Sequence, residues 1–376
     1  AHPNPIHSPG GFVMDSEPGL YDNVLVLDFK SLYPSIIRSF HIDPLGLALG
    51  DETGIPGFLG ARFAREGAIL PQLIEQLWAE RDAARQAGNA ALSQAIKILM
   101  NSFYGVLGSF GCRFFDPRLA SSITRRGHQV INESRGFIEQ QGLRVIYGDT
   151  DSLFVLLGPG MDEETARTTG TRLATQLNAW WRRRLATEFG IESRLEIEFE
   201  THYLRFLMPT TRGTDKGSKK RYAGTVRDGD GVRLVFKGLE SVRTDWTPLA
   251  REFQQELYRR IFLGEPYEAF IRNTTARLHA GELDDQLVYR KRLRRRLEDY
   301  RRNVPPHVQA ARKLDKPGKS VEYLITHAGP EPLEALRSPI DHPHYEERQL
   351  KPVADGILYF LGTSFDEIVQ RQISMF

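Results

Sequence analysis

The stretch Leu143–Leu157, LRVIYGDTDSLFVLL, predicts a β-hairpin with two carboxylates at its tight turn. Apolar runs flank the central YGDTDS of residues 147–152, and Gly and Asp favour such turns. Alternation along a strand allows Asp149 and Asp151, two positions apart, to point to one face. A turn of this kind is suited to a hard divalent cation, although Asp also occurs in turns because its side chain bonds the backbone.

A second acid stands at the end of another predicted strand. Residues 21–29, YDNVLVLDF, have the apolar pattern of a buried strand that ends near Asp28. Residues 31–37, SLYPSII, follow as a tight turn into a helix. Two separate segments therefore each offer a carboxylate where a strand meets a turn.

A helical segment lies between the two acidic elements. In KILMNSFYG, residues 97–105, the side chains of Lys97, Asn101 and Tyr104 recur at intervals of three or four residues. This spacing places them along one face of a helix. The helix belongs to a predicted antiparallel hairpin of residues 70–87 and 91–107, with Gly-Asn between them.

These segments resemble the core motifs of a known family. DFKSLYPSII at 28–37, KILMNSFYG at 97–105 and YGDTDS at 147–152 are similar, in that order, to the three core motifs of family B DNA polymerases. KKRYAG at 219–224 and KGLESVRTD at 237–245 resemble two later motifs of the family. The resemblance therefore covers nearly the whole chain.

The resemblance implies an α+β fold with the right-hand polymerase architecture. An antiparallel-sheet palm would carry helical-hairpin fingers and a mostly helical thumb. We expect the palm over residues 1–69 and 109–238, the fingers over 70–108 and the thumb over 239–376.

The remaining periodicities predict further elements. They are helices over 117–141 and 163–189, strands over 195–200, 204–208, 221–226 and 231–236, and mostly helical, basic sequence from Trp246 onward. Helices packed on an antiparallel sheet are consistent with a palm.

Length and composition limit the number of domains and the kind of protein. The 376 residues, 40% of them hydrophobic, are enough for two or three domains with substantial cores. The single cysteine, Cys112, allows no internal disulfide, and no apolar run approaches the roughly 18 residues that cross a membrane. We expect no membrane association and a cytoplasmic location, at the nucleoid of a bacterium.

The formal net charge of +2 conceals an uneven distribution. Residues 286–319 contain twelve Lys or Arg against three acids. This excess favours phosphate contacts with nucleic acid over a merely solvated helix face. Arginine predominates in the segment, and its planar guanidinium is well suited to phosphate.

The resemblance also implies a chemistry. A primer 3′-hydroxyl would attack an incoming deoxynucleotide and release pyrophosphate, supported by two Mg²⁺ ions for which Mn²⁺ can substitute. The family pattern assigns Asp28 and Asp151 as bridging metal ligands and the backbone carbonyl of Phe29 as a further ligand. It gives Asp149, the remaining catalytic acid, an electrostatic or outer-shell role.

A nucleotide site follows from the same resemblance. Lys97 and Asn101 on one predicted finger helix match the nucleotide-binding face of the family motif. Arg81 and Arg85 on the other helix could face the triphosphate, or could pair with neighbouring acids in water.

The turn after the first acidic strand would contact the nucleotide from another side. The backbone N–H groups of Ser31, Leu32 and Tyr33 at a helix N-terminus are suited to the β- and γ-phosphates. By resemblance, the ring of Tyr33 excludes ribonucleotides because it leaves no room for a 2′-hydroxyl. Tyr104 would line the minor-groove side of the new base pair. Without the resemblance, a buried tyrosine is more commonly a core residue.

The two later motifs imply contacts with primer–template DNA. The candidate contacts are Lys219, Lys220, Arg221, Tyr222, Lys237 and Arg243. Asp245 would orient Arg243. A charged run at the start of a strand is also typical of a solvated sheet edge.

The C-terminal residues suggest a further partner. Gln372, Ile373, Met375 and Phe376 resemble the peptide by which bacterial polymerases bind a sliding clamp, as an alternative to a frayed tail. The expected partners are therefore primer–template DNA, deoxynucleoside triphosphates and a sliding clamp. We expect the chain to be a monomer.

The N-terminal part of the sequence differs from the family pattern. Family B polymerases carry an N-terminal region and a 3′→5′ exonuclease before the palm, whereas only 27 residues precede Asp28. We therefore expect no proofreading. The alternatives are a fragment that binds DNA without catalysis, a non-catalytic scaffold, or another palm enzyme such as a reverse transcriptase, a primase or a nucleotide cyclase. The matches at Asp28, Lys97 and Tyr33 favour a DNA polymerase.

Overall fold

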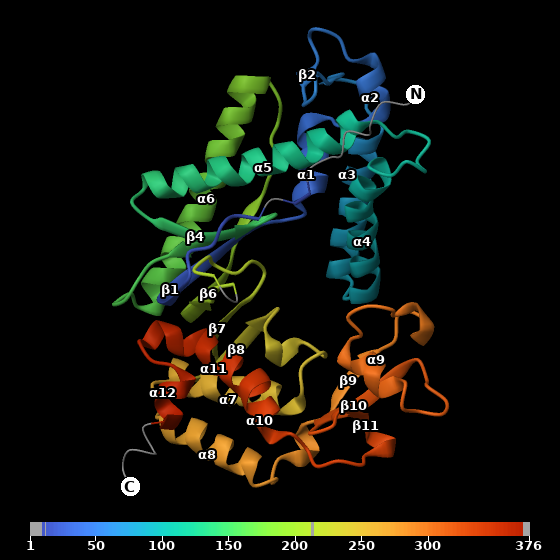
Figure 1. Ribbon diagram of the computed structural model, residues 1–376. Coiled ribbons are helices and arrows are strands. Elements are labelled where there is room, and N and C mark those ends of the chain that lie inside the picture. The colour runs from blue at the N-terminus through green and yellow to red at the C-terminus, as the bar shows by residue number, and fades with distance from the viewer. Residues whose placement is uncertain (1–9, 12, 212–213, 371–376) are drawn as a thin grey trace. The chain divides into compact units, whose positions relative to one another are not determined.

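The structure is a computed structural model that describes residues 10, 11, 13–211 and 214–370 (Figure 1). The chain divides into two compact units. The first comprises Ala1–Glu17 and Tyr21–Leu204, and the second comprises Pro18–Leu20 and Arg205–Phe376. Both contain helices and antiparallel strands, which confirms the predicted α+β class.

The first unit contains most of the strands and the longest helices of the described chain. Its helices are α1 (Leu32–Phe40), α2 (Pro44–Leu49), α3 (Leu70–Gln86), α4 (Ala90–Leu107), α5 (Pro117–Gln140) and α6 (Glu163–Phe189). Its strands are β1 (Gly19–Phe29), β2 (Ile55–Pro56), β3 (Arg62–Phe63), β4 (Arg144–Asp149), β5 (Ser152–Leu156) and β6 (Ile197–Met208), the last of which ends in the second unit.

The main sheet of the first unit has the strand order β4-β5-β1-β6. β1 pairs antiparallel with β5, and Asp28 lies opposite Ser152. β5 also pairs antiparallel with β4, and Asp149 lies opposite the same serine. The hairpin predicted over residues 143–157 is therefore confirmed. Its pairing brings the end of β1 beside the acidic turn.

Strand β1 is the buried centre of this sheet. Residues 24–27 are at most 6% exposed, so the continuous apolar run reflects coverage of both faces of the strand. Helices α5 and α6 contribute apolar side chains to the same core. The Trp181 indole of α6 donates to the Ser134 hydroxyl of α5 at 2.9 Å, which satisfies a buried N–H and joins the two helices.

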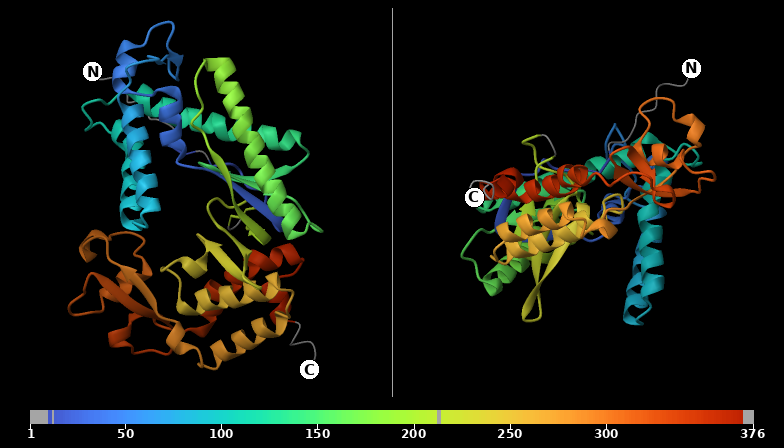
Figure 2. Two further views of the ribbon diagram at one scale, coloured as in Figure 1. Left: turned by 180° about the vertical axis from the view of Figure 1, so that it is seen from behind. Right: turned by 60° about the horizontal axis from the view of Figure 1, so that its bottom comes forward.

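Helices α3 and α4 form the predicted antiparallel hairpin and lie side by side (Figure 2). Gly88 between them takes a φ of +70°, a conformation that glycine adopts without strain. The Asn89 side chain then accepts from the backbone N–H of Leu92 at 3.1 Å and caps α4. The sequence signals at the turn thus account for its geometry.

A buried carboxylate fixes the base of this hairpin. Asp43 is 2% exposed and accepts from the backbone N–H of Gly46 at 2.8 Å and of Leu70 at 2.7 Å. The first bond caps α2 and the second holds the first residue of α3. The hairpin therefore leaves the unit at a defined point after α1.

The second unit combines helices with two groups of strands. Its helices are α7 (Pro248–Phe262), α8 (Glu268–His279), α9 (Pro306–Ala311), α10 (His342–Tyr345), α11 (Lys351–Leu358) and α12 (Phe365–Gln370). Its strands are β7 (Tyr222–Asp228), β8 (Gly231–Lys237), β9 (Tyr289–Arg292), β10 (Ser320–Thr326) and β11 (Gly329–Pro332).

The strands of the second unit form a hairpin and a small sheet. β7 and β8 pair as predicted, with Asp228 opposite Gly231 at the turn, and the end of β6 pairs with β7. The small sheet has the order β11-β10-β9. None of the described helices, in either unit, is both long and apolar enough to span a membrane.

Two predictions of local structure are wrong. Residues 197–208 are one strand, β6, rather than two. Its polar middle continues the strand because His202 bonds the side chain of Asn23 at 2.8 Å. The sequence from Trp246 onward was expected to be mostly helical, but residues 286–319 contain the strand β9, which pairs with β10 and places Tyr289 opposite Tyr323. Part of this basic segment therefore lies on a sheet edge and in loops.

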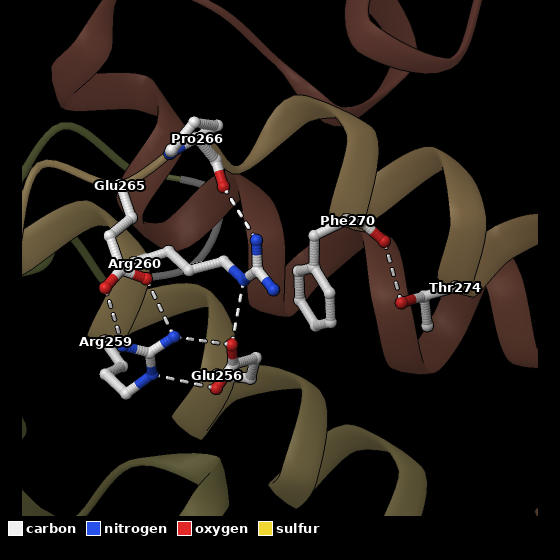
Figure 3. Close-up of polar contacts among 7 residues, drawn as sticks. All are labelled: Glu256, Arg259, Arg260, Glu265, Pro266, Phe270 and Thr274. Atoms are coloured by element: carbon white, nitrogen blue, oxygen red, sulfur yellow. Dashed lines mark hydrogen bonds and ion pairs between the residues drawn. The ribbon is translucent and has the colours of Figure 1, made fainter.

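A charged cluster holds the connection between α7 and α8 (Figure 3). Arg259 bridges Glu256, at 2.9 Å, and Glu265, at 2.8 Å. Arg260 also pairs with Glu256, at 2.8 Å, and its guanidinium lies 4.9 Å from the centre of the Phe270 ring. The two arginines hold the pKa of Glu256 at about 2. The network therefore joins the end of α7 to the residues of the turn that precedes α8.

Candidate active site

One cavity of the first unit gathers most of the predicted site residues. It has a volume of about 540 Å³ and is lined by the ends of β1 and β6, the acidic turn, and helices α1, α3 and α4. The predicted residues in its lining are Asp28, Phe29, Ser31, Leu32, Tyr33, Arg81, Arg85, Lys97, Asn101 and Asp151. Asp149 and Tyr104 lie outside this lining.

Asp28 and Asp151 lie together in the cavity. The backbone N–H of Phe29 donates to the carbonyl of Asp151 at 2.8 Å, which joins the end of β1 to the acidic turn. Burial and the negative charge of Asp151 raise the pKa of Asp28, and burial and Asp149 raise the pKa of Asp151. A bound cation would relieve this concentration of negative charge.

The acidic turn has an unusual backbone. Thr150 takes a φ of +43°, which is rare for a β-branched residue and costs conformational energy. Its hydroxyl donates to the Asp149 carboxylate at 3.0 Å, and the Ser152 hydroxyl donates to the Asp149 carbonyl at 3.1 Å. The turn therefore engages Asp149 in local bonds and leaves Asp151 in the cavity.

Sequence reasoning missed a further acid that acts on the Asp28–Asp151 pair in this cavity. Glu200 on β6 lines it, and its charge contributes to the raised pKa values of Asp28 and Asp151. The alternation of LEIEFE, residues 195–200, puts three glutamates on one face of the strand and could have revealed it. The other two, Glu196 and Glu198, both pair with Lys30.

The N-terminus of α1 opens onto the same cavity. Ser31 precedes the helix in a left-handed conformation, with φ of 42°, and its side chain makes no capping bond. The backbone N–H groups of Leu32 and Tyr33 belong to the first turn, where a helix offers no intrahelical acceptor. The N–H of Lys30 is already bonded to the carbonyl of Glu196 at 2.8 Å. The free donors thus begin after Lys30.

The hairpin helices bring cations to the cavity. Arg81 and Arg85 lie on α3, and Lys97 and Asn101 lie on α4. Asp82 of α3 also lines the cavity, and its charge acts on Arg81, so the interaction with a neighbouring acid and the proposed role toward a triphosphate both stay open. Burial and the charge of Arg85 lower the pKa of Arg81. Lys97 lowers the pKa of Asp28 through its charge.

Tyr33 and Tyr104 lie against each other. Their ring centres are 4.9 Å apart and their planes meet at 53°. Burial raises the pKa of the Tyr33 hydroxyl to about 12, so the side chain stays neutral at physiological pH. Tyr33 lines the cavity, and Tyr104 supports its ring from α4.

The comparison with known families agrees with this arrangement. A family model described as DNA polymerase family B matches residues 6–53 and 60–327. The chain belongs to this family.

Individual family B polymerases resemble the chain over nearly its whole length. It is 56% identical to DNA polymerase II of Escherichia coli, over 99% of this chain and 50% of that protein. It is 29% identical to a DNA polymerase of Thermococcus gorgonarius, over 94% of this chain and 47% of that protein. The resemblance drawn from the sequence motifs to family B polymerases, and to a bacterial member in particular, is confirmed.

A solved structure gives the same result. The family B DNA polymerase from Pyrobaculum calidifontis superposes with a TM-score of 0.65 at 28% identity, over 96% of this chain and 48% of that chain. The chain thus spans about half the length of the family B proteins that it matches.

The acids of this family B chain fit the divalent cations that the family uses. Carboxylate and carbonyl oxygens are the ligands that Mg²⁺ prefers, and it keeps several waters and substrate phosphates besides. Asp28, Asp151 and the carbonyl of Phe29 offer such oxygens. No group of three acidic, histidine or cysteine side chains within the described ranges forms a closed metal cage. A sparse pair of this kind fits a divalent cation that keeps water and phosphate among its ligands.

The later family B motifs lie in the second unit and are partly engaged in internal bonds. Arg221 pairs with the buried carboxylate of Glu240 at 2.9 Å. Arg243 pairs with Asp245 through two bonds, at 3.0 and 2.8 Å, as the orienting role of this acid requires. Lys237 ends β8 and is exposed. The structure therefore gives Arg221 a clear structural partner, which sequence reasoning did not anticipate.

The remaining predicted residues lie around the start of β7 and at the C-terminus. Lys219, Lys220 and Tyr222 lie at the start of β7 in the second unit, and Lys220 has a positive φ of 60°. The candidate clamp-binding residues 372, 373, 375 and 376 lie outside the described part of the chain.

Proposed function

We propose that this chain extends a primer on a DNA template by adding deoxynucleotides to the primer 3′-hydroxyl, with release of pyrophosphate. The observation that carries the proposal is the shared cavity of the Asp28–Asp151 pair and the Lys97 cation. Such a cavity combines a site for divalent cations with a site for a polyanion. The family B membership supports the same reaction, since the relatives named above are DNA polymerases.

The proposed reaction uses divalent cations. Two Mg²⁺ ions, or Mn²⁺ in their place, would activate the 3′-hydroxyl and neutralise the charge that develops on the phosphates. Asp28 and Asp151 would hold them, together with the carbonyl of Phe29. Asp149 acts through its charge, which already raises the pKa of Asp151.

The remaining lining residues bind and orient the nucleotide. Lys97 and Asn101 on α4 and Arg81 and Arg85 on α3 face the triphosphate. The first-turn N–H groups of α1, with Ser31, add backbone donors for the β- and γ-phosphates. Holding the α-phosphorus in line with the hydroxyl lowers the barrier by orientation.

Tyr33 selects the sugar in this proposal. Its ring lines the cavity and is neutral at physiological pH, so it acts by shape rather than by charge. Tyr104 packs on it and lines the minor-groove side of the new base pair.

Contacts with DNA and with a sliding clamp are also proposed. Primer–template DNA would contact the second unit through Lys219, Lys220, Tyr222, Lys237 and Arg243 and through the basic segment of residues 286–319. The C-terminal residues would bind a sliding clamp. We further propose that the chain is a monomer in the bacterial cytoplasm, at the nucleoid.

Primer extension tests the proposed reaction. A labelled primer–template is incubated with Mg²⁺, four deoxynucleotides and either the wild-type chain or the Asp151→Asn variant. We expect extension by the wild type and its loss, by a factor of at least about 10³, in the variant. Asp285→Asn, an exposed acid of the second unit, is the matched control and should extend like the wild type.

The same experiment distinguishes the alternative function. If the wild type binds the primer–template but does not extend it, the chain is a DNA-binding fragment that needs further polypeptide for catalysis. Equal extension by the wild type and Asp151→Asn would refute the metal-site assignment. Shortening of the primer in the absence of nucleotides would contradict the expected lack of exonuclease.

A further inference from the structure

A glycine of α5 lies directly beneath the Tyr33 ring. A Cβ atom built on Gly127 would stand 3.1 Å from Cε1 of Tyr33, closer than ordinary van der Waals contact. The next nearest atoms are Cδ1 of Ile36, at 3.7 Å, and Cδ2 of Leu32, at 3.8 Å. The ring can therefore lie this close to α5 only because residue 127 has no side chain.

Packing alone holds the ring in this position. Within the described ranges, no hydrogen bond is found for the Tyr33 hydroxyl, and burial is the main cause of its raised pKa. Tyr104 contacts the ring from α4, with ring centres 4.9 Å apart. Because the ring is held by van der Waals contacts and not by a hydrogen bond, it shifts when a neighbouring residue becomes larger.

Helix α5 cannot easily move away from the ring. Arg126, next to Gly127, is 6% exposed and lies within 5.0 Å of the centres of three aromatic rings, those of Phe40, Phe58 and Phe189. Its guanidinium also donates to the carbonyl of Pro56 at 2.8 Å. An added methyl group at residue 127 would therefore displace the tyrosine ring rather than the helix backbone.

The direction of that displacement follows from the surroundings. Ile36 and Leu32 are buried core residues at 0% and 3% exposure, so they close the space on the side of Gly127. Tyr33 itself lines the cavity, which offers the open space next to the ring. The ring would move by a few tenths of an ångström toward the space that a nucleotide sugar would occupy.

We infer that Gly127 is a positioning residue that sets the depth of the Tyr33 ring and thereby the selection of deoxyribose over ribose. This inference rests on the proposed function, in which Tyr33 contacts the sugar. Gly127 acts through Tyr33, because Cε1 of Tyr33 is the atom nearest to the built Cβ and the atoms of Ile36 and Leu32 stand at ordinary contact distance.

Single-nucleotide insertion by the 376-residue chain tests the inference. The quantity measured is the ratio of kcat/KM for a deoxynucleotide to that for the matching ribonucleotide. Because a misplacement of 1 Å can cost roughly 10²-fold, a shift of a few tenths should change the ratio about three- to fivefold. In Gly127→Ala the ratio should rise, with a higher KM for the deoxynucleotide and a kcat close to that of the wild type.

Gly136→Ala is the matched control. Gly136 lies on the same helix, and a Cβ there would meet no atom within 4 Å. This variant should keep the wild-type ratio. Any general effect of glycine-to-alanine substitution on α5 would appear in both variants, whereas displacement of the ring would appear in Gly127→Ala alone.

A double-mutant cycle separates a positioning role from a structural one. In the Tyr33→Ala background no ring remains, so Gly127→Ala should no longer change the ratio. Ile36→Val removes Cδ1, 3.7 Å from the built Cβ, and should partly restore the wild-type ratio in Gly127→Ala. The combined Ile36→Val/Gly127→Ala variant also serves as the test if Gly127→Ala alone does not fold, as its melting temperature would show.

The outcomes distinguish the inference from the function on which it rests. No insertion by the wild type would overturn the proposed function. Insertion with a ratio that Tyr33→Ala leaves unchanged would overturn the sugar-selecting role of Tyr33. If Tyr33→Ala lowers the ratio but the Gly127 variants match the wild type, or act equally without the ring, the inference about Gly127 is wrong.

Discussion

Replacing Asp28 by Asn should stabilise the metal-free protein while it abolishes primer extension. Without a cation, the charges of Asp28 and Asp151 face one cavity, and Glu200 adds a third charge nearby. Two unit charges about 4 Å apart interact by about 4 kcal/mol at an effective dielectric constant of about 20. Both groups are only partly buried and their raised pKa values reduce their charge, so we expect a gain of about 1–3 kcal/mol.

Thermal melting in EDTA at pH 8 measures this gain. For a unit of this size, each kcal/mol shifts the melting temperature by about 2–4 °C, so Asp28→Asn should melt about 2–12 °C higher than the wild type. Adding Mg²⁺ at several millimolar should raise the melting temperature of the wild type more than that of the variant, since the cation binds the paired charges. Asp285→Asn, at an exposed position, should follow the wild type in both buffers.

Two results would refute this reasoning. A lower melting temperature of Asp28→Asn in EDTA would mean that the carboxylate stabilises the fold, and that the pair is a structural network rather than a cation site. An equal response to Mg²⁺ in the wild type and the variant would mean that the cation acts elsewhere on the protein.

Three further predictions follow from individual contacts. Lys97→Ala should lower kcat/KM for deoxynucleotides by about 10- to 100-fold, as expected for loss of one charged hydrogen bond to phosphate, and an unchanged value in steady-state kinetics would remove Lys97 from the site. Asp43→Ala should cost about 2–4 kcal/mol in urea denaturation, because it leaves the N–H groups of Gly46 and Leu70 unbonded, and a loss under about 0.5 kcal/mol would contradict their role. Glu331→Gln should lower the melting temperature more at pH 7 than at pH 3. Backbone N–H bonds lower the pKa of this carboxyl, so its stabilisation is present above the unfolded pKa of about 4.5 and is lost as the pH falls through the folded value. An equal difference at both pH values would contradict this linkage.

The local elements of the first unit could be predicted because their signals are local. The acidic hairpin carries its turn residues and flanking apolar runs within 15 residues, and β1 is one continuous apolar stretch. The α3–α4 hairpin is marked by Gly88 and Asn89, whose positive φ and capping bond are what those residue types favour. In each case the sequence pattern and the tertiary structure require the same conformation.

The predictions that were wrong depended on distant partners. β6 continues through polar residues because His202 meets Asn23, 179 residues away. The basic segment of residues 286–319 forms β9 because its partner β10 follows about 30 residues later. Such pairings outweigh local propensity, and no pattern within either segment indicates them.

In the candidate site, too, local patterns indicated some residues, whereas distant contacts place the others. The acids at the strand ends could be identified from spacing, but Glu200 joins them only because β6 lies beside β1. Arg221 was predicted as a DNA contact from its motif, and its bond to Glu240 depends on a residue in a separate turn. The role of Gly127 could not be seen either, because a glycine gives no sign of which side chain lies above it.

Direct counting of bound metal tests the central claim that the Asp28–Asp151 pair is a cation site completed by the nucleotide. The free and bound Mn²⁺ are measured by electron paramagnetic resonance, with primer–template DNA and a non-hydrolysable deoxynucleotide triphosphate present. We expect two Mn²⁺ ions per wild-type chain beyond those bound by the DNA alone, and loss of both in the Asp28→Asn/Asp151→Asn double variant. The same number of bound ions in the wild type and the double variant would contradict the account.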